Sequence, residues 1–282
     1  MKHTKPFCII ALLFLSVSFV QAQTDSSAAT KPKAQFKLSL NYNSGLNYYG
    51  RTDSLKSTGF YPLAELWFTP KFYINAAPVF VHNKLQSFDY AGTVATIGYQ
   101  NVRKKWLTSF YVMKPFYKPS SELVQSALKG QSGLSLSYLN KIVNITAGAD
   151  AKLSDKLDYG TTSGLDHIFK LSFKDNGLLI IDPSAYIYAG TQNFTNTYYQ
   201  KKANFLPITG STEQQVTENV QKFNILSYEL SMPVIYVRGK WMILATSAYV
   251  LPQNLVTVPG RPDLSEKGKD LFYATIGLKR TF

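Results

Sequence analysis

Apolar and polar residues alternate along most of this chain, and the alternation divides it into about twelve segments. In residues 35–43, Phe36, Leu38 and Leu40 fall on one face of an extended chain, and the polar residues between them fall on the other. A period of two residues predicts β-strands, because successive side chains of a strand point to opposite faces. The expected strands cover residues 35–43, 59–68, 71–82, 87–99, 104–114, 131–139, 141–153, 164–173, 177–190, 222–236, 240–251 and 269–282.

The connections between these segments alternate in length. Every second connection is very short, as at residues 69–71, 139–141 and 237–240, whereas the connection between Gly190 and Lys222 runs to roughly thirty residues. We therefore expect an all-β fold, a transmembrane antiparallel up-and-down β-barrel of about 12 strands with short periplasmic turns and long extracellular loops. A count of about ten or fourteen strands stays open, because several segments alternate poorly.

Composition supports a membrane barrel over a soluble domain. Charged residues make up 17% of the chain, against about a quarter in a typical soluble domain. Aromatic residues make up 14%, and after the N-terminal region the apolar runs are shorter than the ~18 residues of a transmembrane helix. Trp67, Trp106 and Trp241 all lie near short turns, as expected for an aromatic girdle at a membrane surface.

The N-terminus has the pattern of an export signal. Lys2 and Lys5 precede the apolar stretch 7–20, and small residues follow before Gln23. We expect a signal peptide at residues 1–22, a disordered periplasmic leader at 23–34 and the barrel at 35–282. An uncleaved membrane anchor is the alternative for the first segment. The only cysteine, Cys8, lies in the signal, so the mature chain needs no disulfide.

The signal, the rhythm of turns and the terminal strand Phe272–Phe282 together resemble the outer-membrane β-barrel superfamily of Gram-negative bacteria. Ile276, Leu278 and Phe282 resemble the C-terminal signal that the barrel-assembly machinery reads, although Arg280 stands where an aromatic residue is common. The resemblance implies the cell outer membrane as the location. It implies outer-membrane lipids, including lipopolysaccharide, and the barrel-assembly machinery as partners.

A narrower resemblance concerns residues 48–54 (Tyr-Tyr-Gly-Arg-Thr-Asp-Ser) and 189–194 (Ala-Gly-Thr-Gln-Asn-Phe). These segments are similar to those of uncharacterised outer-membrane barrel proteins in Bacteroidetes. That family carries no assigned activity, so the resemblance implies a location and a fold, and it leaves the function open.

Charged residues of both signs fall on the strand faces that we expect to line the lumen. They either pair across the interior and fill it, or line a narrow aqueous pore, and twelve strands permit both arrangements. The formal net charge of +13 favours anions in such a pore. The candidate lumen-lining residues are Lys37, Glu65, Asp150, Lys152, Asp166, Lys170, Asp182, Glu229 and Lys279.

The sequence offers little for catalysis. His82 and His167 are the histidines beyond the signal, and the faces beside His167 carry no serine at the expected height. We also find no glycine-rich phosphate loop and no paired-cysteine metal site. We therefore expect no enzyme, no cofactor and no metal.

The function we expect from the sequence is a passive porin-like channel for small solutes. The alternatives are a non-conducting structural or assembly barrel, and a surface-binding receptor or adhesin with a plugged lumen. The long loop 191–221 can also fold inward and narrow the mouth. We expect a monomer with no nucleic-acid partner, because a basic chain behind an export signal meets lipid phosphates first.

Overall fold

The structure is a computed structural model that describes residues 34–174, 176–202, 221–257 and 265–282. The predicted signal peptide and all but the last residue of the predicted leader lie outside the described residues. Those two predictions therefore stay predictions.

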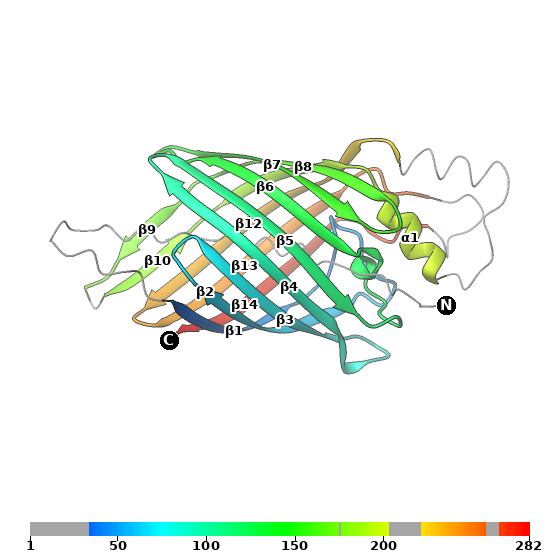
Figure 1. The fold of residues 1–282 in the computed structure, drawn as a ribbon, viewed down its shortest axis with the longest axis horizontal. Helices are drawn as coiled ribbons and strands as arrows, with labels where there is room; N and C mark the ends of the chain where they lie inside the picture. The colour runs from blue at the N-terminus through cyan, green and yellow to red at the C-terminus, as the bar shows by residue number, and fades with distance from the viewer. Residues whose placement is uncertain (1–33, 175, 203–220, 258–264) are drawn as a thin grey trace.

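The described residues form fourteen antiparallel strands in one sheet, drawn in Figure 1. β1 pairs with β2 on one side and β14 on the other, and β11 pairs with both β8 and β12. The sheet thus closes into a barrel of twelve strands, as predicted, with β9 and β10 outside the ring. The strands are β1 (Gln35–Asn43), β2 (Thr58–Trp67), β3 (Phe72–His82), β4 (Ser87–Arg103), β5 (Trp106–Tyr117), β6 (Gly130–Tyr138), β7 (Asn144–Leu153), β8 (Leu157–Asp166), β9 (Phe169–Ser172), β10 (Gly177–Ile181), β11 (Ser184–Gly190), β12 (Asn224–Arg238), β13 (Trp241–Pro252) and β14 (Leu271–Thr281).

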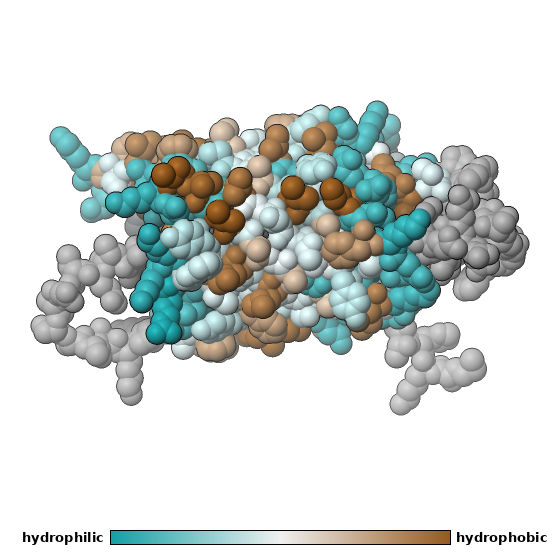
Figure 2. All heavy atoms as spheres, turned by 90° about the horizontal axis from the view of Figure 1, so that it is seen from above, coloured by the Kyte–Doolittle hydropathy of each residue, from teal (hydrophilic) through white to brown (hydrophobic). Residues whose placement is uncertain are grey.

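The outside of the barrel is apolar around its middle. In β1, Leu38 and Leu40 are exposed, whereas Ser39 and Asn41 are buried in the lumen. Figure 2 shows the result for one side of the molecule: brown and pale residues cover the middle of the wall, and teal residues gather at both ends. An apolar exterior over a polar interior is the arrangement of a barrel whose outer solvent is lipid.

The β9–β10 hairpin extends the wall at one end of the barrel, at the left of Figure 1. β9 continues the course of β8 and β10 leads into β11, while β10 also pairs with the last residues of β12. The turn between β9 and β10 lies at the same end as the other short turns, which we call the short-turn end. The opposite end is the long-loop end.

Several sequence-based boundaries were wrong. Residues 157–163 belong to β8, where Leu157 and Tyr159 face outward and Asp158 and Gly160 face inward, although the sequence analysis left this segment in a connection. Residues 100–103 are paired strand, so the turn between β4 and β5 is 104–105. Two connections at the long-loop end, 83–86 and 154–156, are also short. Long connections therefore occupy only part of that end.

The described parts of the long connections at that end include the helices η1 (Val124–Ala127) and α1 (Asn193–Lys202). Among the described residues, no helix is long and apolar enough to cross a membrane.

Candidate functional site

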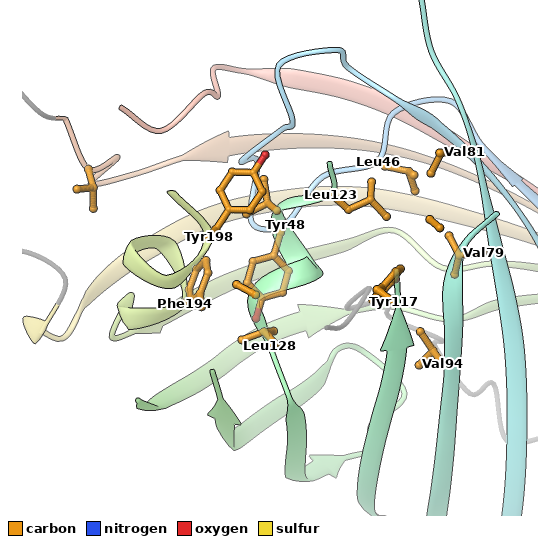
Figure 3. Packing of buried hydrophobic residues seen from close by; sticks show 14 residues of the cluster. Leu46, Tyr48, Val79, Val81, Val94, Tyr117, Leu123, Leu128, Phe194 and Tyr198 are labelled. Carbon is orange, nitrogen blue, oxygen red and sulfur yellow. The ribbon is translucent and has the colours of Figure 1, made fainter. Parts of the chain in front are cut away.

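Four connections at the long-loop end pack together inside the mouth of the barrel. We call their described residues the plug: 44–57, 118–129, 191–202 and the described parts of 253–270. Figure 3 shows their apolar core, in which Leu46, Tyr48, Leu123, Leu128 and Phe194 meet wall residues of β3, β4 and β5. Tyr48 lies edge-on to Phe194, with ring centroids 4.9 Å apart. The plug therefore has a packed core of its own.

Arg51 holds the plug to the opposite wall. Its guanidinium is buried and donates to Glu266 Oε1 at 2.8 Å and to Gln192 Oε1 at 2.5 Å. It also donates to the backbone carbonyls of Tyr49, Leu226 and Gln253. One side chain thereby connects three loops with the wall at β12.

Glu266, the carboxylate partner of Arg51, has further hydrogen bonds that fix its position. Glu266 accepts from Thr195 Oγ1 at 2.6 Å and, through Oε2, from the backbone N–H of Val256 at 2.7 Å. A buried ion pair of this kind tolerates loss of one partner poorly, because the remaining charge stays buried and unpaired. We call the pair Arg51–Glu266 and its hydrogen bonds the latch.

Asp158 fixes the first turn of α1 against the wall. Its carboxylate accepts from the backbone N–H groups of Asn193 and Phe194 at 2.7 and 2.8 Å, and from Thr191 Oγ1 at 2.6 Å. A carboxylate at this position satisfies N–H groups that a helix leaves without partners and suits the positive end of the helix dipole. The long loop thus folds inward at its described start.

Below the plug, the lumen contains a cavity of about 380 Å³. Its lining runs from Tyr49 in the plug to Val102, Leu139 and Lys170 beside the short turns. The space therefore reaches from the short-turn end to the underside of the plug. Burial raises the pKa of the Tyr49 phenol well above its usual range, so this plug residue presents a neutral hydroxyl to the cavity.

Tyrosine rings in the lumen lie flat along the wall. Tyr186 covers Gly164 on the neighbouring strand, and a side chain at that position would overlap the ring. Tyr73 covers Gly98 and Tyr111 covers Gly133 in the same way. Because these glycines let the rings fold sideways, the bulky side chains line the cavity without filling it.

Five of the predicted lumen residues occur in two groups of charges. Lys152 is fully buried and forms an ion pair with Asp150, beside Gly160, where any side chain would take the space of the pair. At the short-turn end, Lys279 Nζ lies 2.8 Å from Glu65 Oε1. Lys37 Nζ lies 4.4 Å from the centroid of the Trp67 ring.

The other four predicted lumen residues lie on β8–β12. Asp166 and Asp182 are buried near the short-turn end and line the cavity together with Lys170, which is exposed on β9. Glu229 faces inward on β12, 3.5 Å from Tyr273 Oη. The charged residues that line the cavity are thus mostly acidic, the opposite of what the net charge of the chain indicates.

Two residues point into the lumen although the sequence pattern places them on the outside of the barrel. The alternation in segment 222–236 puts Leu226 on the outward face, but Leu226 is buried, because an irregularity in the β11–β12 pairing, between Tyr188 and Ala189, shifts the register. Trp67 was counted with the interfacial aromatic residues, but its ring packs against Tyr73 in the lumen, with centroids 4.6 Å apart.

The C-terminal strand presents Ile276, Leu278 and Phe282 to the outside of the barrel. The Arg280 guanidinium lies 5.1 Å from the Trp241 ring centroid and 5.0 Å from that of Phe282. Arg280 therefore contacts two aromatic rings from the position at which the C-terminal signal commonly has an aromatic residue.

His167 lies at the break between β8 and β9. Its Nδ1 is 2.5 Å from the carbonyl oxygen of Ile142, and its ring packs on Phe169. Within the described ranges, no three His, Cys, Asp or Glu side chains are grouped to hold a metal ion.

Sequence reasoning missed the residues of the latch and the Asp158 contact. Arg51, Glu266 and Asp158 occur in polar stretches that read as solvated loops, and the contact between Arg51 and Glu266 spans 215 positions of the sequence. The one available signal was the tyrosine-rich segment around Arg51, because aromatic residues in a solvated loop need an apolar surface to cover them.

No family model matches the chain, and no curated protein matches it. Among solved structures, the KdgM porin has 9% sequence identity and a TM-score of 0.46, over 88% of this chain and 99% of that one. The COG4313 outer membrane channel from Pseudomonas putida F1 has 10% identity and a TM-score of 0.47, over 92% and 100%. LpxR from Salmonella typhimurium has 10% identity and a TM-score of 0.46, over 87% and 100%. These values report a likeness and place the chain in no family.

Proposed function

We propose that this chain is an outer-membrane channel for small solutes whose long-loop mouth is closed by the plug in the conformation described here. The observation that carries the proposal is the cavity of about 380 Å³, which begins at the short-turn end and stops at the plug. The wall around it is a closed ring of paired strands, whereas the barrier is made of loops. Loops move without breaking that ring.

The membrane location belongs to the same proposal. The apolar exterior supports it, and the export signal expected at residues 1–22 agrees with it. Outer-membrane lipids, including lipopolysaccharide, would then surround the wall. Ile276, Leu278 and Phe282, which face outward on the last strand, are our candidates for recognition by the barrel-assembly machinery.

A second candidate function is a non-conducting barrel, and the latch favours it. Arg51 makes five hydrogen bonds and is buried almost completely. Such a network holds the plug in place and would suit a structural barrel or a receptor whose loops present a fixed surface.

Single-channel recording in planar lipid bilayers separates the two. We expect the wild-type barrel to be closed most of the time and Arg51→Ala to conduct in discrete ohmic steps. Loss of one partner of a buried ion pair costs ~3–5 kcal/mol, so the open fraction should rise by more than about a hundredfold. Lys129→Ala is the matched control, because it removes from the plug an exposed ion pair with Asp155 that is not part of the latch.

The non-conducting function predicts a different result. If Arg51→Ala folds to the same barrel as the wild type and still carries no current, the channel proposal is wrong. Equal open fractions in Arg51→Ala and Lys129→Ala would contradict the role of the latch.

A further inference from the structure

Two carboxylates in the lumen form no ion pair with a lysine or arginine among the described residues, and His167 is the basic residue beside them. Asp166 ends β8 and pairs through its backbone with Ser184, the first residue of β11, and Asp182 lies two residues before Ser184, in the link between β10 and β11. Asp166 Oδ2 accepts from Asn144 Nδ2 at 2.6 Å. The Asp182 side chain is buried, with 1% of its surface exposed, yet its Oδ1 accepts no hydrogen bond from the described residues.

The cavity beside these carboxylates is walled by tyrosines. The Tyr186 ring covers Gly164, two residues before Asp166, and stacks on Tyr188 with centroids 6.2 Å apart. Tyr188 lies 5.2 Å from Tyr49 of the plug. Tyr188 Oη is buried and has no hydrogen-bond partner in the described part of the chain. The faces and the free hydroxyl form one continuous surface of the cavity.

The charges and the rings favour one kind of solute. Two carboxylates close together in a partly desolvated space repel each other, and a cation between them removes that cost. Tyrosine faces attract the same cations through their ring quadrupoles. An anion is repelled by both groups, and a neutral solute relieves no charge.

We propose that the lumen binds a small organic cation, an ammonium-bearing solute whose charge lies at Asp166 and Asp182 and whose alkyl groups lie against the face of Tyr186. The proposal deepens the proposed channel function by naming its solute class, and it rests on that function for the solute's passage. Binding itself requires only entry from the short-turn end, where Lys170 and Leu139 line the cavity.

The test is a calorimetric titration of the refolded wild-type barrel in micelles, with choline as the probe and 3,3-dimethylbutan-1-ol as its neutral isostere. Protein-free micelles supply the blank for each ligand. Choline should bind saturably and at least about tenfold more tightly than the isostere, the ratio that ~1.4 kcal/mol produces. Absence of saturable choline binding, or equal affinity for both ligands, would overturn the proposal.

Substitutions locate the site. Asp182→Asn and Asp166→Asn should each weaken choline binding at least about fivefold, whereas Asp155→Asn, on the exposed turn 154–156, should leave it unchanged. Tyr186→Leu keeps both charges and should weaken binding about threefold, so it tests the site even where an Asn variant does not fold. Unchanged affinity in Asp182→Asn and Tyr186→Leu would also overturn the proposal.

The titration separates this inference from the proposed function, because it uses the barrel with the plug in place. Choline binding in a barrel that never conducts would leave the site standing and remove the channel. A conducting Arg51→Ala barrel without choline affinity would leave the channel standing and remove the cation site.

Discussion

At the scale of single residues, burial decides what each charge does. Lys152 and Asp150 form an ion pair inside the barrel, with Lys152 fully buried, whereas Lys129 and Asp155 pair at the surface. The sequence shows both lysines as ordinary polar positions. It indicated correctly which strand face Lys152 occupies. It did not distinguish a lysine that pairs with Asp150, two positions earlier on the same face, from a lysine that lines a pore.

Lys152→Met should therefore destabilise the barrel strongly. The substitution leaves the Asp150 carboxylate without its partner and should lower the free energy of unfolding by ~3–5 kcal/mol, whereas Lys129→Met should lower it by less than ~1 kcal/mol. Urea unfolding of the refolded protein in lipid vesicles measures both. Equal losses for the two variants would show that Lys152 is solvated in the lumen.

At the scale of elements, alternation along the chain predicted most of the strands, because each strand lies between two different solvents. β1, β7 and β14 were recognised with boundaries close to those observed. The method failed in the first half of β8, which it left in a connection, and at Leu226, where a register shift points the side chain into the lumen. The second failure was not avoidable from local pattern, since the register shift depends on the neighbouring strand.

The outward face of β1 provides a test of the same idea. Leu40 lies in the middle of the strand and faces outward, and Leu85 is exposed in the turn 83–86 at the long-loop end. Leu40→Arg should cost ~2–4 kcal/mol in vesicles and Leu85→Arg only ~0–1 kcal/mol, because the cost of an arginine depends on its depth in the bilayer. Urea titration checks both values. Equal costs would contradict a lipid-facing position for Leu40.

At the scale of the whole molecule, the two ends of the barrel differ. The cavity reaches the short-turn end, whereas loops from four separate connections meet at the other. Most of the wall was predictable from the sequence because strands that are neighbours in the chain pair with each other, and pairing of the first strand with the last removes the open edges of the sheet. The plug was not, because the latch joins residues such as Arg51 and Glu266 that are 215 positions apart. The sequence indicated only that a long loop had room to fold inward.

The central claim is a lumen that is open at one end and closed at the other, and the accessibility of a single cysteine tests it most directly. Ser135 lines the cavity, and the sequence has one cysteine, Cys8, within the expected signal peptide. Ser135→Cys in mature protein refolded into vesicles is treated with a membrane-impermeant thiol reagent from one side at a time. Leu85→Cys and Lys105→Cys report which end of the barrel faces the reagent.

We predict that the reagent labels Ser135→Cys from the short-turn side. From the long-loop side the same cysteine should stay unlabelled over the time in which Leu85→Cys reacts completely, and Arg51→Ala in the same chain should remove that protection. Equal labelling of Ser135→Cys from both sides, with Arg51 intact, would contradict the closed mouth.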